Sequence, residues 1–274
     1  MAVYGDSIMR IRYAVSTMVF WGREHCLSFE QECQFLKSLG FGVELWPTIA
    51  GQNECRYDRR NWPRLTAATA NMLVAMRSRK DQPTLEQWAE QIECAKLLAA
   101  NILTDLQNLR IPNGSELDDC DFAAEVVKMA QDRHVKLCIE TGQLQTLNQL
   151  GEKFEAVWYC LDTGYANLDP RFSFRQYVDD LGPRVVHLHL TDNYGQTDDH
   201  EPPGLNGGIA RENWDYLLNA LSRYDTDIVG SFEMSPCTPG VMIRQASEFL
   251  FDVLKWPNRP PKRTRDANII YNPV

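Results

Sequence analysis

The sequence lacks several of the signals by which a function is most easily recognised. Its eight cysteines are scattered singly, with no CxxC or other close pair, so a zinc-thiolate site is not expected. No GxGxxG follows the first predicted strand, which disfavours a dinucleotide-binding fold. There is no run of about 18 apolar residues that could span a bilayer. Because the N-terminal segment also lacks the apolar region of a signal peptide, we expect a cytoplasmic protein with reduced cysteines.

Positive charge is also scarce. The chain has 28 Lys and Arg against 37 Asp and Glu, which gives a net charge of −9. An acidic surface disfavours nucleic acids and anionic membranes, so neither is an expected partner. A small-molecule substrate is expected instead. The hydrophobic content of 44% is sufficient for a sizeable core.

Eight short β-rich runs, several of them continuously apolar, alternate with amphipathic stretches. The runs predict strands at 11–17, 42–48, 71–78, 101–107, 136–142, 157–164, 185–192 and 228–235. Helix boundaries are marked by Ser28 as an N-cap, by Gly40 as a C-terminal stop, and by a capping box formed by Thr84 and Gln87. Only one helix, near 62–69, is predicted between the second and third strands.

This alternation predicts a parallel sheet, and eight such units in about 250 residues match a single closed (β/α)8 TIM barrel. An open, doubly wound sheet is the alternative, which the missing GxGxxG makes weaker. We assign the barrel domain to residues 1–256. The proline-rich, basic segment 257–274 is interpreted as a C-terminal extension on the surface.

Ionisable residues close four consecutive strands: Glu140, Asp162, His189 and Glu233. In a parallel barrel these ends surround one axis, where active sites form. A buried carboxylate is costly unless it is paired or bound to a metal. Three carboxylates and one imidazole suit one divalent cation, Mn²⁺, Mg²⁺ or Co²⁺, with Zn²⁺ as a further option. Taken singly, each of the two glutamates is more compatible with a structural ion pair at the barrel mouth than with a functional role.

Other side chains are expected near this site. His187 has the same parity as His189 but lies one step deeper, so it either supports the site or fills the core. Glu44 is as compatible with a structural partner as with a ligand. Trp21 and Trp46 follow the first two strands, where they would stack on a sugar or cap the core.

The motifs "IETG", "LDTGYANL", "HLHLTDNYGQTDDHEPPG" and "FEMSP" occur in an order and spacing that resemble the sugar phosphate isomerase/epimerase family, with its xylose isomerase-like barrel. Its members include D-tagatose 3-epimerase, hydroxypyruvate isomerase, inosose dehydratase and, more distantly, endonuclease IV. The resemblance implies that Glu140, Asp162, His189 and Glu233 bind one divalent metal, Mn²⁺ first. It also implies that Glu140 and Glu233 act as acid and base on a sugar or hydroxy-ketone, through a metal-stabilised enediolate.

The resemblance further places His200, Asp198 and Tyr165 near the substrate, alongside His187, Trp46 and Trp21. Two positions depart from the family pattern. Tyr165 stands where many members have a histidine, and Gly195 stands where the epimerases have an arginine. Contacts to the far end of a ketohexose are therefore not secured by the resemblance.

Three other functions stay open. A dehydratase of a keto-inositol or similar ketone would use the same metal site and the same first step. An endonuclease IV-like phosphodiesterase is disfavoured, because at the N-terminal strand ends His25 alone is available for its histidine-rich zinc site. A non-catalytic binding protein could keep the same pocket. The partner expected in every case except the endonuclease is a small sugar or polyol-derived molecule, and a homo-oligomer is compatible with the chain.

Overall fold

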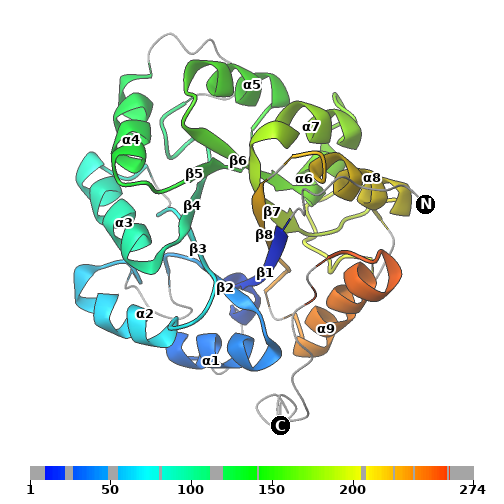
Figure 1. Cartoon of the computed structure of the whole chain (residues 1–274), viewed down its shortest axis with the longest axis horizontal. Helices are drawn as coiled ribbons and strands as arrows, with labels where there is room; N and C mark the ends of the chain where they lie inside the picture. Colours follow the sequence, from blue (N-terminus) through cyan, green and yellow to red (C-terminus); the bar gives the residue numbers. More distant parts are fainter. Residues whose placement is uncertain are drawn as a thin grey trace.

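A computed structural model describes residues 10–21, 27–48, 55–79, 82–111, 120–140, 142–204, 208–224, 226–236, 238–257 and 259. Within these residues, eight parallel strands close into a barrel in chain order, and β1 pairs with β8. The strands form the centre and the helices surround them (Figure 1). The predicted (β/α)8 fold is confirmed.

The strands are β1 (Arg10–Ser16), β2 (Gly42–Leu45), β3 (Val74–Arg77), β4 (Asn101–Thr104), β5 (Leu137–Ile139), β6 (Val157–Asp162), β7 (Val185–Leu190) and β8 (Asp227–Phe232). The helices are α1 (Phe29–Leu39), α2 (Trp62–Ala68), α3 (Leu85–Leu98), α4 (Asp121–Asp132), α5 (Leu144–Lys153), α6 (Thr163–Leu168), α7 (Phe174–Leu181), α8 (Arg211–Leu221) and α9 (Gly240–Glu248). Short 3-10 turns cover Thr17–Phe20, Arg59–Asn61 and Gly182–Arg184, and a π-helical turn covers Phe249–Val253.

The predicted helix boundaries follow from local capping. Ser28 and Gln31 form a capping box at the start of α1, and Gly40 ends that helix with a φ of +84°, a conformation that favours glycine. Thr84 and Gln87 form the expected box on α3. The helix predicted near 62–69 is α2.

Apart from β1, which has the predicted length, the strands are shorter than predicted, mainly because the predicted runs included the first residues of the loop that leaves the barrel. Residues 136–142 show this: the strand covers only Leu137–Ile139, although the amide of Glu140 still donates to the carbonyl of Thr104 at 2.9 Å. Helix α6 was not predicted. It starts directly at the end of β6, where the Asp162 carboxylate accepts from the amide of Tyr165.

Two apolar layers line the strands. The larger one lies between strands and helices, and a smaller cluster comprises Ala75, Leu103, Cys138, Cys160 and Val186. The members on β3, β5 and β6 stand two residues before Arg77, Glu140 and Asp162, so the cluster forms a layer inside the barrel beneath the strand ends. A register shift between β6 and β7, at Tyr159 and Cys160, accommodates one extra residue there.

Most of the predicted extension 257–274 lies outside the described residues, as does His25. Pro257 is described, and its carbonyl accepts a hydrogen bond from the Tyr13 hydroxyl at 2.9 Å. Among the helices in the described ranges, none has both the length and the apolar character needed to cross a membrane.

Candidate functional site

Four side chains from the last four strands converge at the carboxyl end of the barrel. Glu140, Asp162, His189 and Glu233 each offer a ligand atom, and these atoms all lie within 4.8 Å of one another. All four residues are buried, with at most 6% of their surface exposed. The structure thus brings together the four residues predicted as ligands.

Strand pairing and two small residues create this convergence. Asp162 and His189 are partners in the β6–β7 ladder, so their side chains emerge side by side. The Thr163 hydroxyl joins the strand ends by contacting the carbonyls of His189 and Thr191 at 2.9 and 2.6 Å. A Cβ at Gly164 would lie 2.9 Å from Thr191 and from Asn193, which explains a glycine in "LDTG".

The His189 ring faces carboxylates with both nitrogens. Nδ1 lies 2.7 Å from Glu140 Oε1, 3.0 Å from Glu233 Oε2 and 3.7 Å from Asp162 Oδ2. Nε2 lies 3.0 Å from Oε2 of Glu44 on β2. Metal-binding histidines commonly donate their second ring N–H to a carboxylate in this way, which fixes the tautomer and the ring plane.

His187 lies one layer deeper than His189. It is fully buried, and its Nε2 lies 3.2 Å from the same Glu44 oxygen. This position favours the supporting role over direct contact with a substrate. It also gives Glu44, which the sequence left undecided, a partner role: its carboxylate holds two imidazoles.

The donor set fits a hard divalent cation. Nδ1 of His189 and Oε2 of Glu233 are buried and 3.0 Å apart, and neither forms a well-aligned hydrogen bond in the described part of the chain. Backed by two further carboxylates, they are donor atoms that a shared cation would satisfy. Oxygen and imidazole donors without thiolate suit Mn²⁺, Mg²⁺ or Co²⁺, and also accommodate Zn²⁺.

Arg77 is the residue of this site that the sequence reasoning missed. It stands at the end of β3, with its guanidinium bonded to Glu140 at 2.7 and 2.5 Å and to Glu233 at 3.0 Å. The guanidinium carbon lies 4.5 Å from the ring centre of Trp46, a cation–π distance. Its position could have identified it, because it is an ionisable residue at a strand end and its side chain points to the same side of the sheet as that of Ala75, two residues earlier.

Charge and burial act in opposite directions on the carboxylates. Burial alone would raise the pKa of Glu140, but the charges of Arg77 and His189 lower it to about 2. Asp162 has no arginine partner in the described chain, and burial raises its pKa despite the opposing effect of the His189 ring 3.7 Å away. The two carboxylates therefore differ in how strongly they hold a proton.

The family of the chain follows from a comparison across most of its length. The family model for xylose isomerase-like TIM barrels matches residues 60–253, more than half of the chain. The protein belongs to this family. No curated protein sequence matches the chain significantly.

The solved structures with the same barrel include three sugar epimerases. A 3-keto-D-glucoside 4-epimerase from E. coli superposes with a TM-score of 0.62 at 14% identity, covering 89% of this chain and 100% of that one. A D-allulose 3-epimerase from Methylomonas sp., in complex with D-allulose, gives 0.59 at 13% identity, covering 95% and 93%. A D-psicose 3-epimerase from Clostridium cellulolyticum H10, with D-tagatose, gives 0.54 at 16% identity, covering 80% and 84%. At these identities the likeness establishes the fold.

The exit loop of β7 brings one more residue to the strand-end cluster. His200 Nδ1 lies 4.0 Å from Glu233 Oε2, and its Nε2 lies 3.3 Å from the half-exposed Asp198. Burial would lower the pKa of His200, but Asp198 and Glu233 raise it to about 9. Its backbone carbonyl accepts from the amide of Ser235, which ties this loop to the exit of β8.

The aromatic residues divide into two groups. Trp46 is buried, donates from Nε1 to Ser16 at 2.8 Å and meets Trp21 edge-on at 4.8 Å, beside the arginine. Tyr165 is half-buried and packs against Tyr177 on α7, with ring centres 6.2 Å apart. Trp46 thus reaches the cluster through Arg77, whereas the ring of Tyr165 packs toward the helical layer.

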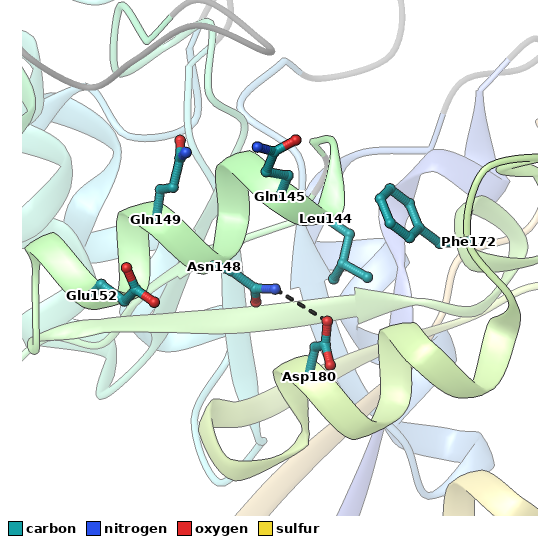
Figure 2. A pocket seen from close by; sticks show the side chains of 7 residues that line it. All are labelled: Leu144, Gln145, Asn148, Gln149, Glu152, Phe172 and Asp180. Atoms are coloured by element: carbon teal, nitrogen blue, oxygen red, sulfur yellow. Dashed lines mark hydrogen bonds between the residues drawn. The ribbon is translucent and has the colours of Figure 1, made fainter.

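A separate groove of about 340 Å³ lies on the outer helical layer, between α5 and α7. Figure 2 shows the side chains that line it: Leu144, Gln145, Asn148, Gln149, Glu152, Phe172 and Asp180. Asn148 and Asp180 bond to each other across it at 3.1 Å. It shares no residue with the strand-end cluster.

Proposed function

We propose that the protein is a divalent-metal-dependent isomerase or epimerase that acts on a sugar or hydroxy-ketone. The observation that carries the proposal is the set of four donor atoms within 4.8 Å, with the Nδ1 face of His189 turned toward three carboxylates. Membership of a family whose solved relatives include sugar epimerases supports the substrate class.

Glu140, Asp162, His189 and Glu233 would hold the metal, with Mn²⁺ as the first candidate. When bound, a divalent cation polarises a carbonyl oxygen and so acidifies the neighbouring C–H bond. Glu44 keeps His189 in the tautomer that leaves Nδ1 available. Thr163 fixes the distance between the strand ends that carry Asp162 and His189.

Glu140 and Glu233 would exchange the proton with the substrate carbon. They approach the cluster from β5 and β8, and Arg77 connects them at their shared side. Burial would raise the pKa of Glu140, but Arg77 and His189 lower it to about 2, so this carboxylate would act as a base only on a C–H bond that is itself acidified. His200, Asp198, Trp46, Trp21 and Tyr165 are proposed to contact the remainder of the substrate.

The test is solvent exchange at carbon. Incubation of the Mn²⁺-supplemented protein with a panel of ketoses in D₂O should place deuterium next to the carbonyl, detected by NMR. A panel without exchange, run at substrate concentrations above the millimolar range typical of KM values, would argue against the proposal. Appearance of an ultraviolet enone absorbance would instead identify a dehydratase, which begins with the same proton abstraction.

A further inference from the structure

Arg77 and His189 contact the two glutamates from opposite sides of the barrel. β3 carries Arg77 and β7 carries His189, and these strands are four positions apart in the closed ring. Glu233 turns Oε2 to His189 and Oε1 to Arg77, each at 3.0 Å. Glu140 accepts a hydrogen bond from Arg77 at 2.7 Å, and its other oxygen forms an ion pair with the same guanidinium at 2.5 Å. The glutamates therefore lie between a fixed guanidinium and the candidate metal position.

The charges of the cluster make this arrangement consequential. Glu140, Asp162 and Glu233 bring three negative charges, and a divalent cation offsets two of them. Arg77 supplies the third positive charge, and its side chain is only 13% exposed, so solvent screens it little. The guanidinium must therefore attract the carboxylates and repel a cation bound to them.

We propose that Arg77 is a positioning residue that fixes Glu140 and Glu233 and, as a resident cation, lowers the affinity of the site for its divalent metal. The inference rests on the proposed function, because it concerns the same metal. Carboxylates fixed in this way present their remaining lone pairs to the metal and the substrate in one geometry. Arg77 thus lowers the affinity for the metal while it fixes the positions of the two glutamates.

The experiment is a titration of chelator-treated, full-length protein with Mn²⁺ alone, followed by the EPR signal of free Mn²⁺. In Arg77→Met the charge is lost, while an apolar chain remains against Trp46. We expect this variant to bind one Mn²⁺ about tenfold to a hundredfold more tightly than the wild type, the range by which outer contacts alter metal affinity. Its deuterium exchange should nevertheless be slower, a combination that partial unfolding would not produce.

Two variants separate charge from geometry. Arg77→Lys keeps the charge but loses the forked donor pair, so its Mn²⁺ affinity should stay near that of the wild type while exchange slows. Arg79→Met is the matched control, because it removes the same charge two residues along the chain. Arg79 pairs with Asp58 and Glu90 at 2.8 and 3.1 Å, away from the cluster, so its loss should leave Mn²⁺ affinity unchanged.

The outcomes discriminate between the inference and the function on which it rests. Unchanged or weaker Mn²⁺ binding in Arg77→Met overturns the inference and leaves the proposed function standing. Binding by Arg77→Met but not by the wild type supports the inference and contradicts a metal-dependent function. If neither binds Mn²⁺, the inference fails, and the D₂O exchange test decides the function separately. Should circular dichroism show that Arg77→Met is unfolded, Arg77→Gln replaces it.

Discussion

The first half of the barrel, β1 to β4, and the second half, β5 to β8, contribute different kinds of residue to the site. Strands β5 to β8 supply all four candidate ligands, whereas β2 and β3 supply Glu44 and Arg77, which touch those ligands without joining the set. The first half thus orients what the second half presents. The comparison teaches that a barrel can place its candidate ligands in one half and the residues that contact those ligands in the other, where the sequence carries few motifs.

The largest loss of activity is expected from substitutions of the candidate ligands in the second half. Glu140→Gln and Glu233→Gln keep the shape of the side chain but remove the base, so deuterium exchange should fall by about 10² to 10⁴. The NMR assay above measures this. Glu152→Gln, on the surface of α5, is the control and should exchange at the wild-type rate. Equal rates in all three variants would rule out a glutamate base.

Substitution of a buried ion pair in the first half should mainly lower the stability of the fold. Arg56 and Glu32 form a buried ion pair at 2.7 Å, with neither side chain exposed. Arg56→Met leaves the Glu32 charge without its partner and should lower the free energy of unfolding by about 3–5 kcal/mol. Urea denaturation measures the loss. Arg64→Met provides the comparison. Arg64, on α2, forms an exposed ion pair with Glu30, which lies on α1 two residues before Glu32. Loss of this exposed pair should lower the free energy of unfolding by at most about 1 kcal/mol.

Glu44 tests whether the first half orients the second. Glu44→Gln removes the charged acceptor of both buried histidines and should weaken Mn²⁺ binding by about tenfold to a hundredfold. The EPR titration reports the affinity directly. The direction is opposite to that expected for Arg77→Met, although both residues belong to the first half. A loss of stability without a change in affinity would assign Glu44 to the core alone.

The smallest effect is expected at Tyr165, in the second half but turned toward the helices. Tyr165→Phe should change the free energy of unfolding by less than about 0.5 kcal/mol, because the ring contact with Tyr177 is kept. Thermal or urea unfolding checks this. A rise in KM with unchanged kcat, once a substrate is known, would show that the hydroxyl binds that substrate.

The candidate ligands of the second half could be predicted from the sequence because each can be recognised within its own short segment. Glu140, Asp162 and Glu233 each end an apolar run, and strand-end position alone predicts their meeting in a closed barrel. The helix that follows Asp162 was missed because it begins on the last strand residue, so no polar linker separates the two elements. Strand lengths were overestimated because the predicted runs continued past the last paired residue into the exit segments, as after Ile139 and Leu190.

The first half could not be predicted in the same way. Arg77 ends the run "VAMR", where one long polar side chain resembles an ordinary strand terminus. Its partners Glu140 and Glu233 lie 63 and 156 residues away, and Glu44 reaches His189 across 145. Such pairs depend on barrel closure, which brings opposite walls within reach of one side chain.

The small apolar layer beneath the strand ends fills the barrel interior, so that the site lies in a cup that is closed from below. Ala75, Leu103, Cys138, Cys160 and Val186 form its floor, and the charged cluster stands directly above them. An apolar floor offers no polar groups to an ion or a water molecule. Metal, substrate and product would therefore share the rim between the strand-exit loops, and a molecule that lodges there would stop both turnover and the exchange of the metal.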